Sequence, residues 1–266
     1  MVQATIGVIG GSGFYAFLDN AVEVVVATPY GEPSDPVVVG AISGRNVAFI
    51  PRHGRDHRYP PHQIPYRANL WALRSLGVRQ ILAPCAVGGL RAELGPGALV
   101  VPDQLVDRTR DRPQTFHDTG AVHVSFADPY CPRGRRTAVQ QAVAAGWPVT
   151  DGGTMVVIEG PRFSTRAESR WFAAQGWDVV NMTGHPEAVL ARELALCYTA
   201  VALVTDLDAG VDGSAAVTQQ EVFAAFEANT DRLRSLLYAV VASLSETRDC
   251  ECGKALDGID HDLALP

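Results

Sequence analysis

The sequence predicts an α/β protein, because apolar strand segments alternate with polar loops that open into helices. Two such units stand in the middle of the chain. The apolar segment Met155–Ile158 runs into a turn, after which Thr165 and Glu168 have the spacing of a helix capping box. The strand Val179–Val180 ends in the polar stretch 181–183, and a proline follows at the start of the next helix. Ligands bind at this edge of open α/β sheets, so we expect the site there.

Four side chains in these two loops are suited to ligand contact. Arg162 and Phe163 offer a cation and an aromatic face in the first loop. Met182 and Thr183 offer an apolar contact and a hydroxyl in the second.

The other elements follow from the same patterns. Short apolar runs bounded by turn residues predict strands, and apolar residues at helical spacing predict helices. Strands are expected at Ile6–Ile9, Val22–Ala27, Val37–Ile42, Val47–Pro51, Ile81–Gly89, Leu99–Asp103 and Tyr198–Val204. Helices are expected at Tyr66–Leu76, Arg135–Ala145 and Ala188–Leu196, and from the capping box Thr218 and Glu221 to about Glu246. The long, polar, irregular segment Asp107–Pro132 is typical of a functional loop or an interface arm.

Length and composition favour one domain over residues 1–266. With 266 residues, 47% of them hydrophobic, the chain can form a core that needs neither disulfide nor metal. The formal net charge of −7 argues against binding to nucleic acid or to a membrane surface. Lys254 is the only lysine, which excludes a Walker-type phosphate loop. A phosphate site must therefore use arginine, hydroxyls and backbone N–H groups.

The ends of the chain and its cysteines favour a reducing cytoplasm. We expect no signal peptide, because no basic segment precedes the first apolar run, and no apolar run is long enough to span a membrane. The polar tail 247–266 has no assigned role. Its Cys250 and Cys252 have no second cysteine or histidine pair at metal-ligand spacing, so we expect no metal there. Cys197 lies in an apolar run and is expected in the core.

A glycine loop follows the first strand. Its sequence, Gly11-Ser-Gly-Phe-Tyr-Ala16, fits the G-x-G-x-x-A pattern of a dinucleotide-binding loop. Only about seven residues separate Gly13 from the next strand, which is too few for a full crossover helix. Free N–H groups and the Ser12 hydroxyl suit a single phosphate equally well.

Two polar clusters stand directly after strands. Arg52 and His53 could supply charge-assisted donors to a buried phosphate, or form a solvated loop. Asp206 and Asp208 are two residues apart, so in an extended chain both carboxylates point to the same side. They could accept a hydrogen bond from an exocyclic amine or pass a proton to a leaving nitrogen. Alternatively, they could cap a turn or a helix.

Together these residues resemble the S-methyl-5′-thioadenosine phosphorylase branch of the purine nucleoside phosphorylases. The matching segments are 6–13, 52–55, 102–113, 153–169, 181–187 and 205–208. The resemblance implies a single-domain α/β fold with a central mixed β-sheet flanked by helices, a homotrimer, no metal and no cofactor. It implies cleavage of the N-glycosidic bond of a purine nucleoside, with inorganic phosphate as co-substrate.

The resemblance also implies roles for individual residues. Phosphate would be bound by a set of six: Ser12, Arg52, His53, Cys85, Ala86 and Thr183. Met182 would lie against the ribose and Phe163 against the purine face. Asp206 would contact N7 and the 6-amino group, with Asp208 behind it. His123, on the long arm, would reach into the site of a neighbouring subunit.

Three positions depart from the family pattern. Cys85 stands where threonine is frequent, and His185 replaces a small residue. Gln219 stands in the segment that lines the 5′ pocket, where methylthio-specific members keep an apolar residue. A phosphorylase acting on 5′-hydroxy or 6-oxopurine nucleosides (adenosine, inosine, methylthioinosine) is therefore the alternative. Other classes are a dinucleotide-dependent oxidoreductase, resting on residues 11–16 alone, and a non-catalytic nucleoside-binding protein.

Overall fold

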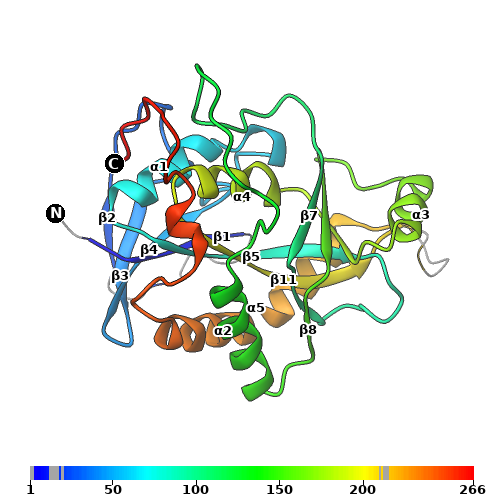
Figure 1. Ribbon diagram of the computed structural model, residues 1–266. Coiled ribbons are helices and arrows are strands. Elements are labelled where there is room, and N and C mark those ends of the chain that lie inside the picture. The colour runs from blue at the N-terminus through cyan, green and yellow to red at the C-terminus, as the bar shows by residue number, and fades with distance from the viewer. Residues whose placement is uncertain (1–2, 12–17, 19–20, 210, 212–215) are drawn as a thin grey trace.

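The computed structural model describes residues 3–11, 18, 21–209, 211 and 216–266. One mixed β-sheet of 11 strands forms the centre of this part of the chain, with helices on both sides (Figure 1). The predicted fold, a single-domain α/β architecture with a central mixed sheet, is confirmed. No helix in the described ranges is long and apolar enough to cross a membrane.

The strands largely match the expected segments. They are β1 (Ile6–Gly10), β2 (Val22–Val24), β3 (Val37–Ile42), β4 (Arg45–Pro51), β5 (Gln80–Gly89), β6 (Leu99–Val101), β7 (Gln104–Arg108), β8 (Val149–Asp151), β9 (Thr154–Ile158), β10 (Val179–Asn181) and β11 (Cys197–Leu207). Two differences matter for the site. The last strand, β11, extends to Leu207 and so includes Asp206, and the start of the expected arm belongs to β7.

The helices are α1 (Tyr66–Ser75), α2 (Pro132–Ala144), α3 (Arg166–Ala174), α4 (Gly184–Glu193) and α5 (Gln219–Ser243), with 3₁₀ turns η1 (Pro61–Gln63) and η2 (Glu251–Lys254). Both predicted capping boxes are confirmed, at the starts of α3 and α5. The first helical residue of α5 is therefore Gln219, whose position is fixed by the Thr218 cap.

The sheet branches at β5. One path runs β2-β3-β4-β1-β5-β10-β9-β7, and β5 also pairs in parallel with β11 along its whole length. The β5–β11 register shifts between Val204 and Asp206, which is a β-bulge near the carboxyl end of β11. The bulge opposes Asp206 to Gly88, at the point where the site begins.

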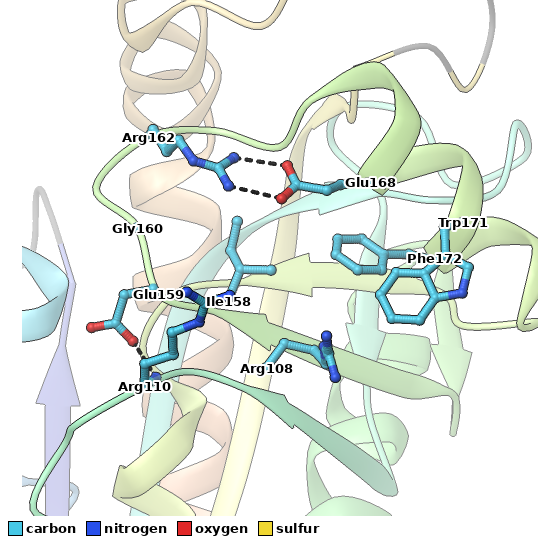
Figure 2. Close-up of a pocket in the computed structure, with 9 residues that line it drawn as sticks. All are labelled: Arg108, Arg110, Ile158, Glu159, Gly160, Arg162, Glu168, Trp171 and Phe172. Atoms are coloured by element: carbon cyan, nitrogen blue, oxygen red, sulfur yellow. Dashed lines mark hydrogen bonds and ion pairs between the residues drawn. The ribbon is translucent and has the colours of Figure 1, made fainter.

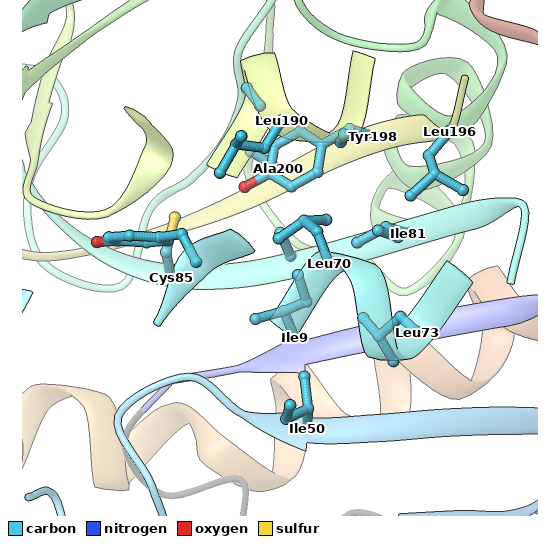
Figure 3. Packing of buried hydrophobic residues seen from close by; sticks show 14 of the residues in the cluster. Ile9, Ile50, Leu70, Leu73, Ile81, Cys85, Leu190, Leu196, Tyr198 and Ala200 are labelled. Carbon is cyan, nitrogen blue, oxygen red and sulfur yellow. The ribbon is translucent and has the colours of Figure 1, made fainter. Parts of the chain in front are cut away.

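Both faces of the central strands are buried, which explains their continuous apolar runs. In β5, Ile81 packs in the core beneath α1 and α4, whereas Leu82 packs in the core beneath α2 and α5. Figure 3 shows the first core, where Leu70 of α1 and Leu190 of α4 meet the sheet. Truncating such a buried leucine to alanine typically costs about 2–5 kcal/mol. The buried β5–β11 pair therefore fixes the position of the side chains at its carboxyl end.

The C-terminal tail packs against the body. Leu263 and Leu265 are partly buried against the α1/α4 core, and Cys250 and Cys252 are buried. The tail was predicted only as a polar segment without a role. Its apolar contacts are single residues in a polar sequence, which give no periodic signal.

Candidate active site

Most of the predicted site residues line one cavity of about 460 Å³. It lies where β1, β4, β10 and β11 end, beside the second half of β5. Ten of the twelve predicted residues line it: Arg52, His53, Cys85, Ala86, Phe163, Met182, Thr183, Asp206, Asp208 and Gln219. The eleventh, Ser12, lies outside the described residues, as does most of the glycine loop. The twelfth, His123, is exposed on the arm and does not line the cavity of its own chain.

Arg52 is held in a buried ion pair. Its Nε and Nη2 donate to the two carboxylate oxygens of Glu187 at 2.8 and 2.9 Å, and both side chains are almost fully buried. Nη2 and Nη1 also donate to the carbonyls of Ile9 and Pro84 at 3.1 Å. Four of its five N–H groups are therefore used within the protein, which leaves one on Nη1. Arg52 can offer an anion one hydrogen bond, not the full fork that the sequence predicted.

His53 presents one ring nitrogen to the cavity side. Its Nδ1 lies 2.8 Å from the carbonyl oxygen of Tyr59, so Nδ1 carries a proton and Nε2 is the remaining polar atom. Burial, with the nearby Arg52 charge, lowers the pKa of His53 to about 4. The ring is neutral at pH 7, and Nε2 can accept a hydrogen bond from a hydroxyl.

Asn181 organises the loop that carries Met182 and Thr183. Its Oδ1 accepts from the backbone N–H groups of Thr183 and Gly184 at 2.8 and 2.7 Å. Its Nδ2 donates to the carbonyl of Ala86 at 3.0 Å, which ties the loop to β5. The two backbone N–H groups are thus already used, and the Thr183 hydroxyl also donates to Asn181 Oδ1, at a longer 3.3 Å. This hydroxyl would have to turn away from Asn181 to donate to a ligand. No role in the site was predicted for Asn181.

Cys85 is a buried, neutral thiol that lines the cavity. Burial raises the pKa of this thiol to about 12 despite the neighbouring Arg52 charge. A neutral thiol is a weak donor, so the side chain adds little to anion binding. The departure from threonine at this position therefore weakens one contact and introduces no nucleophile.

Two carboxylates form the opposite end of the cavity. Asp208 is 2% exposed and accepts a 2.6 Å hydrogen bond from Ser169 Oγ. Asp206 accepts from Thr205 Oγ1 at 2.7 Å, and burial together with the Asp208 charge raises its pKa to about 6. A Cβ on Gly88 would lie 3.1 Å from Asp206 Oδ1, so a larger residue at position 88 would push against the carboxylate.

An apolar slot joins the two polar ends. It includes Phe163, Met182 and Val180. Gly160 has φ +64°, and a Cβ there would lie 2.7 Å from the Met182 sulfur, so the turn before Phe163 fits closely against Met182. Ser164 also lines the cavity, and its buried Oγ has no hydrogen-bond partner among the described residues. Such a group is costly unless a ligand pairs with it.

The first two turns of α5 form one wall. Gln219, Val222, Phe223 and Phe226 all line the cavity. Their spacing is i, i+3, i+4 and i+7, the spacing of one helix face. The last three were missed in the sequence, although this pattern was available to find them. Gln219 is exposed. The other three residues of this wall are apolar.

Arg162 does not belong to this cavity. It forms a bidentate ion pair with Glu168 at 2.7 Å and lines a separate cavity of about 300 Å³ (Figure 2). The two side chains that the sequence offered in this loop are therefore separated: Arg162 lines the second cavity, whereas Phe163 lines the first. The polar face of that second cavity consists of Arg108, Arg110, Glu159 and this pair.

His185 lies behind the site, not in it. Its Nε2 is 2.9 Å from Gln114 Oε1 and 3.3 Å from Asp107 Oδ2. Arg112 also donates to the carbonyls of Met182 and His185. These contacts tie the base of the arm to the Asn181 loop, which accounts for a large residue at position 185.

A mixed sheet whose strand ends hold Arg52 and His53, an apolar slot and a buried carboxylate pair defines an α/β enzyme with one composite ligand site. The chain belongs to the phosphorylase superfamily, whose family model matches residues 5–244.

Relatives cover almost the whole chain. A protein of Streptomyces coelicolor named purine nucleoside phosphorylase is 62% identical, over 100% of this chain and 99% of its own. An S-methyl-5′-thioadenosine phosphorylase of Mycolicibacterium smegmatis is 57% identical, over 98% and 99%. Among solved structures, a methylthioadenosine phosphorylase from an antarctic soil metagenomic library superimposes with a TM-score of 0.90 at 41% identity, covering 97% of this chain and 92% of that one.

Proposed function

We propose that this protein cleaves the N-glycosidic bond of S-methyl-5′-thioadenosine with inorganic phosphate, giving adenine and 5-methylthioribose 1-phosphate. It is thus a pentosyltransferase of purine and methionine salvage, with phosphate as co-substrate and no cofactor. The observation that carries the proposal is the single cavity that joins an anion-binding end to an apolar slot and the Asp206–Asp208 pair. Support comes from a relative and a solved structure that are both named as methylthioadenosine phosphorylases.

The geometry supports a division of labour in the reaction. Phosphate attacks C1′ of the ribose as that carbon gains positive charge, and the purine leaves with the bond electrons. The phosphate is held by the free Nη1 N–H of Arg52, by His53 and by the Thr183 hydroxyl, with backbone groups near Ala86 and Ser12. Neutral His53 accepts the P–OH hydrogen of the phosphate dianion through Nε2, so binding needs no net proton uptake.

The base and the ribose occupy the apolar middle. Phe163 covers the purine face, and Met182 lies against the sugar. Ser164 Oγ supplies a hydrogen bond to the base edge, because it is buried beside the slot without a protein partner among the described residues. Asp206 faces N7 and the 6-amino group, and Asp208, fixed by Ser169, maintains its orientation.

The α5 wall supports the methylthio preference, and Gln219 limits it. Val222, Phe223 and Phe226 suit an apolar 5′ substituent, whereas the Gln219 amide suits a 5′-hydroxyl. This residue and the name of the Streptomyces relative favour one second candidate, a phosphorylase that also accepts 5′-hydroxy nucleosides.

Substituting Gln219 by valine should favour methylthioadenosine over adenosine. The amide is at an exposed rim, so we expect a change of about 1 kcal/mol, or about fivefold in the ratio of kcat/KM values. Gln220→Val is the matched control, because Gln220 is exposed, adjacent and absent from the cavity wall. An equal change in both variants, or no change in either, would mean that Gln219 does not read the 5′ group.

One assay tests the proposed activity. Base release from methylthioadenosine, adenosine, methylthioinosine and inosine is measured with and without phosphate. We expect methylthioadenosine to give the highest kcat/KM and phosphate-free reactions to be inactive. Release of base without phosphate, binding without turnover, or a requirement for a nicotinamide cofactor would reject the proposal.

The arm supports a homotrimer with shared sites. Its base is bonded to its own chain through Arg112, whereas residues 118–121 and His123 are exposed, and Figure 1 shows this green loop extending from the body. We expect His123→Ala to raise KM for the nucleoside without changing the assembly mass, because the residue would complete a neighbouring site. If sedimentation equilibrium showed that the active species is a monomer, this arrangement would be contradicted. A cytoplasmic location, which cell fractionation would test, is consistent with five cysteines that form no disulfide.

A further inference from the structure

Four cysteines from three distant parts of the chain meet beside the N-terminus of α2. Cys131 precedes α2, Cys197 is the first residue of β11, and Cys250 and Cys252 belong to the tail. All four are buried, and their sulfur atoms lie within 4.8 Å of one another. Together they form a separate cluster, which we call the four-cysteine cluster. No step of the proposed reaction uses it, and the fifth cysteine, Cys85, is in the active-site cavity.

The sulfur spacing matches metal coordination. Cys250 Sγ lies 3.4 Å from Cys197 Sγ and 3.8 Å from Cys131 Sγ. A disulfide would bring two sulfurs to about 2.05 Å. In a tetrahedral zinc site with Zn–S bonds of about 2.3 Å, the sulfurs are about 3.8 Å apart. These two distances are close to the edge of that tetrahedron, and all four sulfurs lie within 4.8 Å of one another.

The surroundings suit thiolate ligands. Backbone N–H groups of Arg133 and Gly134, in the first turn of α2, face the Cys131 sulfur. The N-terminus of a helix and its N–H groups stabilise negative charge. The backbone is fixed as well, since Cys131 N donates to the carbonyl of Tyr198 at 2.8 Å. Flanking contacts hold the tail in place, through the Arg133–Asp249 ion pair and the bond from Arg248 to the carbonyl of Ala195.

We propose that the four-cysteine cluster binds one zinc ion in a closed, tetrahedral, structural site. Four protein sulfurs fill the coordination sphere, so no position remains for substrate or water. The ion would join the end of the arm, the start of β11 and the tail. Since β11 carries Asp206 at its other end, the site would stabilise the framework of the active site without taking part in the chemistry. The sequence predicted no metal here because 52 residues or more separate Cys197 from either tail cysteine and from Cys131.

Metal analysis of the full-length, untagged protein tests this site. Protein produced with zinc in the medium should contain about one zinc ion per chain after gel filtration. Reconstitution with cobalt(II) should give the visible absorption and the sulfur-to-cobalt charge-transfer bands of tetrahedral thiolate coordination. Neither measurement depends on a variant that folds.

Variants then assign the ligands. Cys250→Ser/Cys252→Ser should reduce bound zinc by about tenfold or more, whereas Cys85→Ser, the matched control outside the cluster, should retain it. Thiol titration of the denatured, chelator-treated wild type should count all five cysteines. Metal-free wild-type protein with five free thiols would overturn the proposal, and so would protein whose cluster is closed by two disulfides.

Discussion

Arg52→Ala should lower the free energy of unfolding by about 3–5 kcal/mol, in addition to weakening phosphate binding. The substitution leaves the Glu187 carboxylate, which is 1% exposed, with Tyr198 as its remaining hydroxyl donor at 2.7 Å. An uncompensated charge at that depth is costly because neither water nor a second cation can reach it. Urea unfolding monitored by fluorescence measures the loss.

Arg162→Ala is the matched control for this prediction. Arg162 forms the same bidentate pair with a glutamate, but its side chain is 65% exposed, so its loss should cost no more than about 1 kcal/mol. The double variant Arg52→Met/Glu187→Met removes both charges and should be more stable than Arg52→Ala. Similar losses for Arg52→Ala and Arg162→Ala would show that the buried pair is not the cause.

The fold was predictable because its signals are local. Strand-forming apolar runs, the Thr165 and Thr218 caps and the polar residues after each strand all lie within a few residues of one another. Parallel strands then bring their carboxyl ends together, which is why Arg52 and Asp206 meet in one cavity. The family resemblance supplied the roles that local patterns left open.

The parts that were missed depend on long-range contacts. Glu187 is 135 residues from Arg52, and nothing near Arg52 indicates that most of its donors are used within the protein. The four-cysteine cluster likewise joins residues that share no sequence spacing. Burial decides these roles, and a residue's depth in the fold cannot be read from its neighbours in the chain.

The α5 wall is an instructive intermediate case. Its residues have clear helical spacing, but an apolar helix face normally indicates the core. Here Phe226 is 3% exposed and belongs to the core, whereas Phe223 is 44% exposed. The same face therefore passes from core to cavity within one turn. The sequence shows the face, and only the packing shows where along it the cavity begins.

Asp206→Asn should reduce adenine release by about 10²–10⁴-fold and shift the preference towards 6-oxopurine nucleosides. A 6-amino group donates a hydrogen bond, and an ionised aspartate only accepts, so the wild-type pair is matched. A 6-oxo group only accepts, and it would leave two acceptors facing each other in a buried site. Asparagine can donate through its amide, which removes that conflict for the oxopurine. The ratio of kcat/KM for methylthioadenosine and methylthioinosine measures the shift.

The pH profile separates the two states of Asp206. With its pKa raised to about 6, the carboxyl is protonated below about pH 6 and ionised above it. If the protonated form donates to N7 as the base leaves, kcat/KM should fall as the pH rises through this value. Asp206→Asn, which does not titrate, should lose that limb while keeping the phosphate dependence at higher pH. A limb that persists in the variant would belong to another group, and faster cleavage of methylthioinosine by the wild type would reject Asp206 as the residue that selects the 6-amino group.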